Sequence, residues 1–341
     1  MSNTLTQLTD RRTVLQTTGA AMALGLAGCT GSDDEDYPSE NVHAIITSSE
    51  GGGTDQYGRV ILPEVGEVLD VTMEIENIGG AATLRGTGEM MGSEPDGHTL
   101  AAFNMPSTVL ASQVNDAPFN LQDVTGVATY GRNSNVAIIN GDLREELGIE
   151  GYEDLLEAYE DGDIDAIAGQ ETGNHYHVQA TQVMPEQHGF SLPEYVAYSG
   201  SGEISQAVAS GEVPVGITTD SGAEPAVDEN GDVQVVATFT SFESPVFPDV
   251  GTVTDEGYEN IDWVATQIRG YWMPPETPED RVEIMSEAIE DALESDAVQE
   301  WAENTGNIVE YGGPQETEDT LNEQYETIEQ EIDIDQVAAD S

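Results

Sequence analysis

The stretch Glu50-Gly51-Gly52-Gly53-Thr54-Asp55 decides how the rest of the chain is interpreted. It follows the apolar run 42–46, which predicts a buried strand, and precedes residues 56–68, whose apolar spacing predicts a helix. A glycine loop between a strand and a helix lets backbone N–H groups approach a ligand and adds the positive end of the helix dipole. We therefore expect an anion site here, with a tight turn that binds nothing as the alternative.

Strand and helix patterns alternate along the rest of the chain and predict an α/β fold of two lobes, with the ligand at the carboxyl ends of parallel strands. Pro214 favours an edge position for the strand candidate 213–217. The other strand candidates are residues 71–75, 99–103, 124–130, 136–139, 164–168, 195–198 and 233–238. Helices are predicted at 151–161, at 175–187, between 277 and 306, and at 317–332.

The composition is strongly acidic. The 341 residues include 67 acids and 8 arginines but no lysine, which gives a net charge of -59. A disordered acidic chain is one interpretation, but the 38% of hydrophobic residues and the clear periodicities favour a folded protein from a very salty environment. Concentrated salt screens the repulsion between acids, so we expect dilute buffer to destabilise the fold and nucleic acid to be excluded as a partner.

The first 28 residues predict an export signal. Arg11 and Arg12 precede a mildly apolar stretch that is shorter than the ~20 residues needed to span a bilayer. The arginine pair resembles a twin-arginine signal, and Leu26-Ala27-Gly28-Cys29 resembles a lipoprotein box. We predict a signal peptide at 1–28, lipidation of Cys29, an acidic tether at 29–40, and anchoring on the outer face of the cytoplasmic membrane. The alternative is a disordered N-terminus with a chance cysteine.

Between residue 37 and about residue 331, weak motifs follow one another in a specific order. They are Tyr37-Pro38, Gly51-Gly52-Gly53-Thr54-Asp55 with Arg59, Asn77 with Gly80-Ala81, Pro95-Asp96-Gly97-His98-Thr99-Leu100, Gly173-Asn174 with His177, Val196-Ala197-Tyr198-Ser199-Gly200, Phe247-Pro248-Asp249-Val250, and Thr277-Pro278. This ordered set resembles the substrate-binding proteins of tripartite tricarboxylate transporters, the Bug or TctC type, here in the form of a haloarchaeal-type lipoprotein.

The resemblance implies a class II periplasmic-binding-protein-like fold with two Rossmann-like lobes that close like a Venus flytrap. We expect lobe 1 at 41–138 plus 256–341 and lobe 2 at 139–255. The resemblance also implies a receptor without catalysis, cofactor or metal, which captures a di- or tricarboxylate or a related organic acid and delivers it to the membrane permease. The implied ligand-binding residues are Ser48, Ser49, Gly52, Gly53, Thr54, Asp55, Gly80, Ala81, Thr172, Gly173, Asn174, Ser199, Gly200, Ser201 and Asp220.

Three positions depart from the family's usual pattern. Ser48 replaces an aromatic residue, Glu50 replaces a proline, and Ser199 replaces a frequent lysine. Glu50 adds negative charge beside the expected anion site, so it points outward, contacts a ligand amine, or indicates a ligand that is not a simple polycarboxylate. Asp55 has two possible roles, which are to cap the following helix and to orient a ligand hydroxyl or water.

Several charged residues have a structural and a functional interpretation. Arg59 lies one helical turn after Asp55, which favours a salt bridge over ligand contact, and Arg85 and Arg132 are further candidate contacts. His175 and His177 suggest a metal site, but the helical pattern does not place them on one face, and we favour a hydrogen-bonding role for His177.

Three other functions stay open. The receptor could serve a sensory partner instead of a permease, or it could bind an amino acid or another solute that is not a polycarboxylate. A nucleotide-using enzyme would also explain the glycine loop, with Glu76 as the acid after the second strand. The sequence contains no serine nucleophile elbow and no phosphate loop with its lysine, so no catalytic set is predicted.

Overall fold

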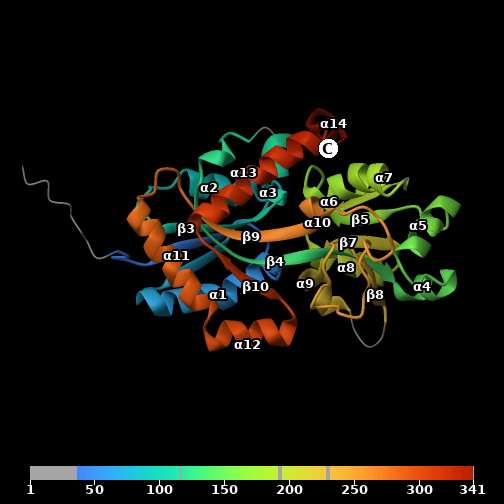
Figure 1. Ribbon diagram of the computed structural model, residues 1–341, viewed down its shortest axis with the longest axis horizontal. Helices are drawn as coiled ribbons and strands as arrows, with labels where there is room; N and C mark the ends of the chain where they lie inside the picture. Colours follow the sequence, from blue (N-terminus) through green and yellow to red (C-terminus); the bar gives the residue numbers. More distant parts are fainter. Residues whose placement is uncertain (1–36, 116, 191–193, 228–230, 341) are drawn as a thin grey trace, which may run out of the picture. The chain divides into compact units, whose positions relative to one another are not determined.

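Two long antiparallel strands, β4 (Thr125–Asn140) and β9 (Thr266–Met273), run through the middle of the fold (Figure 1). The structure is a computed structural model and describes residues 37–115, 117–190, 194–227 and 231–340. Strand β9 pairs with β3 (Thr99–Met105) on one side and with the first part of β4 on the other. The last part of β4 pairs with β7 (Val215–Thr219) and β8 (Val233–Thr238). One continuous strand therefore joins two halves of the sheet.

The described strands form a sheet in the order β2-β1-β3-β9-β4-β7-β5-β6, and β8 and β10 also pair with β4. We call β1–β3, β9, β10 and the first part of β4 the first half, and β5–β8 with the last part of β4 the second half, and each half includes the helices and loops that directly follow its strands. Strand β1 is parallel to β2 and β3, and β5 is parallel to β6 and β7. The strands not yet bounded are β1 (Val42–Ile46), β2 (Met73–Asn77), β5 (Ile167–Gln170), β6 (Tyr195–Tyr198) and β10 (Ile308–Gly312).

Helices cover both faces of this sheet (Figure 1). Helix α1 (Gly53–Leu69) lies against α11 (Glu279–Leu293), and its residues Tyr57, Ile61 and Val65 are buried there at the predicted helical spacing. The other described helices are α2 (Leu84–Met91), α3 (Ser107–Val114), α4 (Gly141–Leu147), α5 (Tyr152–Asp161), α6 (His175–Val178), α7 (Met184–Gln187), α8 (Ser201–Ala209), α9 (Asp220–Ala223), α10 (Asp262–Ala265), α12 (Asp296–Thr305), α13 (Pro314–Glu331) and α14 (Ile334–Asp340). A π-helical turn, Gln179–Val183, connects α6 to α7.

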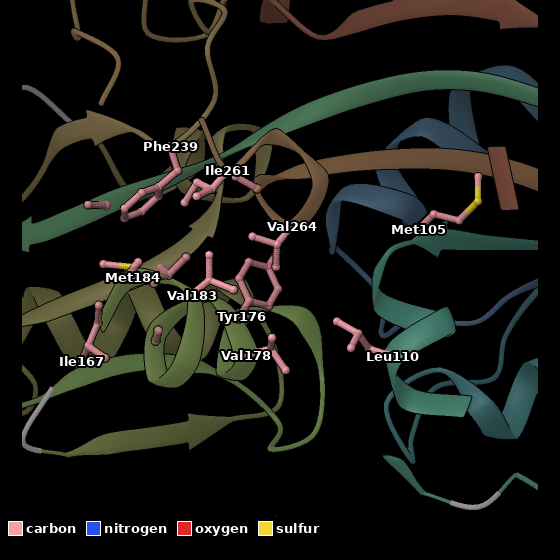
Figure 2. Close-up of a cluster of buried hydrophobic side chains, with 14 of the residues drawn as sticks. Met105, Leu110, Ile167, Tyr176, Val178, Val183, Met184, Phe239, Ile261 and Val264 are labelled. Atoms are coloured by element: carbon pink, nitrogen blue, oxygen red, sulfur yellow. The ribbon is translucent and has the colours of Figure 1, made fainter. Parts of the chain in front are cut away.

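One hydrophobic cluster extends through both halves of the sheet. It includes Met105 and Leu110 from the first half and Ile167, Tyr176 and Phe239 from the second. Figure 2 shows the Tyr176 ring directed toward Val264 of α10, with Val183 beside it. Because burial of apolar area drives folding at roughly 25 cal/mol per Å², this shared core stabilises the two halves together.

The sequence prediction failed where polar residues interrupt the central strands. The candidates 124–130 and 136–139 belong to the single strand β4, and β9 was not predicted. Asn133, Ser134 and Asn135 break the apolar pattern of β4 yet are buried. Gln267 and Arg269 do the same in β9. Each of these side chains makes at least one hydrogen bond to another buried group, so the tertiary structure overrides the local pattern.

Two smaller predictions were also wrong. Strand β7 lies between β4 and β5 and not at an edge, because Pro214 precedes the strand and only its carbonyl is used, as acceptor from Asn140 N. Strand β10 was missed, and β5 begins at residue 167, three residues later than the candidate 164–168. The α/β class, by contrast, agrees with the pattern of the sequence.

The N-terminal predictions fall mostly outside the described residues. The signal peptide 1–28, Cys29 and the tether up to residue 36 are not described. The last predicted tether residues, 37–40, are described, and there the Tyr37 hydroxyl donates to Gly97 O over 2.7 Å. The predicted lobe boundaries stay predictions. Among the described helices, none combines the length and apolar character required to cross a bilayer.

Candidate functional site

A pocket of about 350 Å³ lies where loops from both halves of the sheet meet. Thr47 follows β1, Gln170 ends β5, Ser199 follows β6 and Thr219 ends β7, so the pocket is at the carboxyl ends of parallel strands, as the pattern predicts. The lining residues are Thr47, Ser48, Ser49, Gly52, Gly53, Thr54, Gly79, Gly80, Ala82, Thr83, Asn104, Ser107, Gln170, Glu171, Asn174, Tyr176, Ser199, Gly200, Ser201, Thr219, Gln267 and Arg269.

The N-termini of two helices face this pocket. Gly52 is the N-cap residue of α1, and Gly200 is the N-cap residue of α8. The two loops approach each other closely, because a Cβ atom on Gly200 would lie 3.5 Å from Ser49 Oγ. Each helix N-terminus carries a positive partial charge and unpaired N–H groups. The loops therefore offer an anion two neighbouring regions of positive potential.

Arg269 of β9 adds a full positive charge to the same region. Its side chain is 1% exposed, its Nη1 donates to Thr54 Oγ1 over 2.9 Å, and its Nε donates to Asn133 Oδ1 over 2.7 Å. The guanidinium carbon lies 4.7 Å from the centre of the Tyr57 ring. No carboxylate lies within 4.0 Å of this guanidinium in the described part of the chain. With two of its five N–H donors so engaged, Arg269 keeps capacity to bind a carboxylate.

Gly53 lets Arg269 come this close. A Cβ atom on Gly53 would lie 2.5 Å from Arg269 Nη2 and 3.0 Å from Ser221 Oγ. The close approach, and not a positive φ, is therefore what requires glycine at this position. The glycine loop of α1 and the arginine of β9 form one unit, although 216 positions separate them in the sequence.

Asp220 is connected to Arg269 through hydrogen bonds that both make to Asn133. Its Oδ1 accepts from Asn133 Nδ2 over 2.7 Å, while Asn133 Oδ1 accepts from Arg269. Burial raises the pKa of Asp220, and the hydrogen bonds from Ser244, Ser221, Asn133 and Ser134 oppose that rise. Asp220 does not line the pocket, so the structure places it behind the site.

A buried histidine lies beneath the pocket. His175 Nδ1 is 2.9 Å from Ser107 Oγ, and its Nε2 is 2.9 Å from Gln267 Nε2. Burial lowers the pKa of His175 to about 3, so the ring is neutral at ordinary pH. A neutral ring that accepts the Gln267 amide hydrogen at Nε2 carries its own hydrogen on Nδ1 and donates it to Ser107. This arrangement fixes the position of Ser107 at the pocket.

Two buried polar atoms at the pocket have no hydrogen-bond partner in the described structure. They are Ser48 Oγ and Asn104 Oδ1. The amide of Asn104 is oriented by its other atom, since Nδ2 donates to Thr54 Oγ1 over 2.8 Å. Buried polar groups are nearly always satisfied in folded proteins, so these atoms are candidate ligand or water contacts.

The structure brings most of the predicted ligand-binding residues together. Those that line the pocket are Ser48, Ser49, Gly52, Gly53, Thr54, Gly80, Asn174, Ser199, Gly200 and Ser201. Those that do not line it are Asp55, Ala81, Thr172, Gly173 and Asp220. Contact of any of them with a ligand stays a prediction.

Asp55 is occupied by its own loop and helix. Its carboxylate accepts from Gly51 N over 2.8 Å and from Asn77 Nδ2 over 2.9 Å, and Arg59 Nε lies 2.9 Å from Oδ1. Burial raises the pKa of Asp55, but hydrogen bonds from Gly51, Arg59 and Asn77 outweigh it and leave the pKa lowered. The salt-bridge interpretation of Arg59 is confirmed. Asp55 ties the glycine loop to the first turn of α1.

The other charged candidates lie outside the pocket. Arg132 pairs with Glu310, at 3.1 Å between Nε and Oε2, and Arg85 is exposed. Glu50 is also exposed and does not line the pocket. His177 Nδ1 accepts from Gly173 N over 3.4 Å, consistent with the hydrogen-bonding role. Within the described residues, no group of three or more His, Cys, Asp and Glu side chains could hold a metal ion.

Sequence reasoning missed both charged residues that line the pocket, Arg269 and Glu171. Arg269 and Gln267 were overlooked because β9 itself was not predicted, and Glu171 was hidden in a chain rich in acids. Asn104 and Ser107 were missed because they lie at the end of β3 and the start of α3. An arginine within an otherwise apolar run, 268–273, was the available signal in a chain with eight arginines.

Comparison with known proteins gives matches across most of the chain. The family model of the tripartite tricarboxylate transporter family receptor, TctC, matches residues 58–334. A UPF0065 protein of Cupriavidus necator is 25% identical over 279 residues, which are 81% of each chain. MatC from Rhodopseudomonas palustris, solved with bound malate, is 22% identical with a TM-score of 0.74 and covers 89% of this chain and 100% of its own. A second R. palustris protein, solved with adipate, is 19% identical with a TM-score of 0.74, covering 89% and 99%.

These structural likenesses bear on the fold. They confirm the predicted α/β architecture, in which a mixed sheet with crossover strands has the arrangement found in periplasmic binding proteins. The backbones superpose over most of this chain, but the sequences are only 19–22% identical. The likeness therefore gives no information about individual pocket residues.

Proposed function

The chain belongs to the tripartite tricarboxylate transporter receptor family, and from that premise we propose that it is an extracytoplasmic receptor for a small organic acid. The observation that carries the proposal is the convergence of Arg269 and the N-termini of α1 and α8 on one pocket. A carboxylate at this point receives charge-assisted hydrogen bonds from the guanidinium and from backbone N–H groups. Relatives solved with malate and with adipate support the same ligand class.

The pocket volume fits a ligand of modest size. At about 350 Å³ it is at the lower end of the ~300–1,000 Å³ typical of small-molecule sites. The lining is dominated by glycine, serine, threonine and amide side chains. Such a surface can recognise a polar solute through many hydrogen bonds.

We further propose that ligand binding changes the relation between the two halves and that a membrane permease recognises the liganded form. A ligand can shift this equilibrium only through different affinities for the two states, so contacts from both halves are required. The pocket meets that requirement, because Gly53 and Arg269 belong to the first half while Ser201 and Glu171 belong to the second.

The test of the binding function is a thermal-shift screen of the purified chain in multimolar KCl. The panel contains malate, succinate, citrate, adipate, glutamate, aspartate and neutral sugars. A ligand at 100 times its dissociation constant adds about 2.7 kcal/mol, which is readily seen as a higher melting temperature. Stabilisation by at least one carboxylate is expected. Stabilisation by neutral sugars alone would contradict the proposal.

We also propose that the chain is exported by its N-terminal signal and anchored through a lipid on Cys29. The support is the order of the arginine pair, the apolar stretch and the Leu-Ala-Gly-Cys run in the sequence. In cells of the source organism, the wild-type chain is expected to partition into detergent, and the Cys29→Ser chain into the aqueous phase. Equal partitioning of the two chains would contradict the anchor.

A further inference from the structure

Among the residues that line the pocket, two carry a formal charge at neutral pH. They are Arg269 from the first half and Glu171 from the second. Arg269 adjoins Thr54 and Gly53, whereas Glu171 adjoins Ala82. They do not form a salt bridge with each other, since no N–O pair between them lies within 4.0 Å. The pocket is therefore a neutral site with separated charges of opposite sign.

Glu171 is held in place by the opposite wall of the pocket. It follows directly after Gln170, the last residue of β5, and its Oε2 accepts from Ala82 N over 2.7 Å. Ala82 lies in a run of three non-glycine residues with positive φ, Ala81 at 50°, Ala82 at 50° and Thr83 at 81°. Such backbone is strained for residues with a side chain, and strained turns occur at ligand sites. The turn directs the Ala82 N–H toward the carboxylate.

The hydrogen bond to Ala82 uses only part of the accepting capacity of Glu171. A carboxylate has about four lone-pair sites, and no described arginine or histidine lies within 4.0 Å of this one. A second carboxylate of a ligand placed near Glu171 is repelled, and removal of water on binding strengthens that repulsion. A ligand ammonium at the same place is attracted and completes the hydrogen bonds of the carboxylate.

We propose that Glu171 is a specificity-determining residue that selects carboxylates bearing an ammonium group, with the ligand carboxylate at Arg269 and its ammonium at Glu171. This inference rests on the proposed function, because it assumes that an organic acid occupies the pocket. From the sequence, contact with a ligand amine was one possible role of Glu50, but Glu50 is exposed and lies outside the pocket. The inference assigns that contact to Glu171. Amino-acid-like zwitterions then bind more tightly than di- or tricarboxylates.

The alternative is that Glu171 only links the two walls through Ala82. The Glu171→Gln variant separates these roles, because glutamine keeps an acceptor for the Ala82 N–H and removes the charge. Glu50→Gln is the matched control, since it removes an equal charge from an exposed residue beside the glycine loop of α1. Circular dichroism and the melting temperature without ligand report whether each variant folds.

The experiment is calorimetric titration of the purified full chain in multimolar KCl with three matched pairs of acids. The pairs are glutarate and glutamate, succinate and 4-aminobutyrate, and malate and aspartate. In the pair that binds best, we expect the ammonium-bearing acid to bind at least tenfold more tightly to the wild type. Glu171→Gln is expected to reduce this preference at least tenfold, and Glu50→Gln to leave it within threefold.

Three results would overturn the inference. Succinate and glutarate could bind the wild type at least as tightly as their amino counterparts, or Glu171→Gln could leave the preference unchanged. Malate could also equal aspartate, which would show that a hydrogen-bond donor suffices without positive charge. In each of these cases the proposed function stands. A folded chain that binds no carboxylate of either kind overturns both.

Discussion

The two walls of the pocket share one local plan but differ in charge. In the first half, β1 leads through the glycine loop into α1, and in the second half β6 leads through Ser199 and Gly200 into α8. Both plans end in a positive helix N-terminus. Neighbouring elements contribute one charged side chain to each wall, and the two charges have opposite signs. Strand β9 places Arg269 beside α1, whereas the turn after β5 places Glu171 in the second wall. In the proposed function, the repeated arrangement attracts the anion, and the charges of Arg269 and Glu171 distinguish the two sides of the pocket.

The largest change in ligand affinity is expected when the positive charge of Arg269 is removed. Arg269→Gln deletes a buried charge that donates to Thr54 and Asn133. Loss of one partner from a buried, charge-assisted contact typically costs 2–5 kcal/mol, so affinity for an acid is expected to fall about 100-fold. Calorimetry in multimolar KCl measures the change.

The control for this variant is Arg59→Gln. Arg59 is also near the glycine loop, but it pairs with Asp55 and does not line the pocket. Its replacement is expected to change ligand affinity less than threefold. If the folded Arg269→Gln chain bound its acid as tightly as the control, Arg269 would contribute nothing to affinity. The N-terminus of α1 alone would then bind the ligand carboxylate on this side of the pocket.

A smaller effect is expected when Arg269 is displaced but kept. Gly53→Ala places a methyl group 2.5 Å from Arg269 Nη2, so the buried guanidinium must shift and strain its hydrogen bonds to Thr54 and Asn133. We expect a 10- to 50-fold loss of affinity, of the order caused by a small misplacement of a binding group.

Gly202→Ala is the matched control on the other wall. Gly202 lies in the first turn of α8, and no atom lies within 4 Å of a Cβ placed there. Alanine has the higher helix propensity, so this variant is expected to be as stable as the wild type or up to about 1 kcal/mol more stable, with unchanged affinity. Equal affinities of the two variants would show that the position of Arg269 does not matter.

The same comparison shows how far the sequence could predict this site. The glycine loop, the α1 helix and the loop at 199–201 were predicted because their signals are local. Arg269 was not, because its strand looks irregular until the buried partners Asn133 and Thr54 are known. Glu171 could not be distinguished among 67 acids, since only the fold separates a pocket carboxylate from a surface one. Local elements follow from local pattern, whereas the polarity of the pocket depends on contacts between distant segments.

The buried ring beneath the pocket predicts a dependence of stability on pH. Burial lowers the pKa of His175 to about 3, below its ordinary value of 6.5. Between these values the unfolded chain binds a proton that the folded chain excludes, so stability is full above about pH 6.5 and falls as the pH is lowered. The expected slope is on the order of 1 kcal/mol per pH unit.

Chemical unfolding at pH 7, 6 and 5 in multimolar KCl measures this slope. His175→Gln is expected to be less stable at pH 7 but to lose less stability on acidification. Part of the slope persists in the variant, because burial also lowers the pKa of His188. Identical slopes for the wild type and the variant would contradict a neutral, buried His175.

The smallest effect is expected from Asp55, an acid that lies next to the positive wall yet is fully occupied. Its carboxylate receives hydrogen bonds from Gly51 and Asn77 and pairs with Arg59, whose side chain is 48% exposed. Asp55→Asn keeps one acceptor and removes the charge, so we expect a loss of about 1 kcal/mol in the free energy of unfolding. Because Asp55 does not line the pocket, ligand affinity is expected to change less than threefold.

The pH dependence of the Asp55 effect gives an internal control. The lowered pKa of Asp55 means that its carboxylate stabilises the fold above the unfolded-state pKa and loses that effect as the pH falls through the folded-state value. The difference in stability between wild type and Asp55→Asn should therefore shrink in acid. A tenfold change in ligand affinity at neutral pH would instead place Asp55 within electrostatic reach of the ligand. The polarity of the pocket would then depend on three charges and not on Arg269 and Glu171 alone.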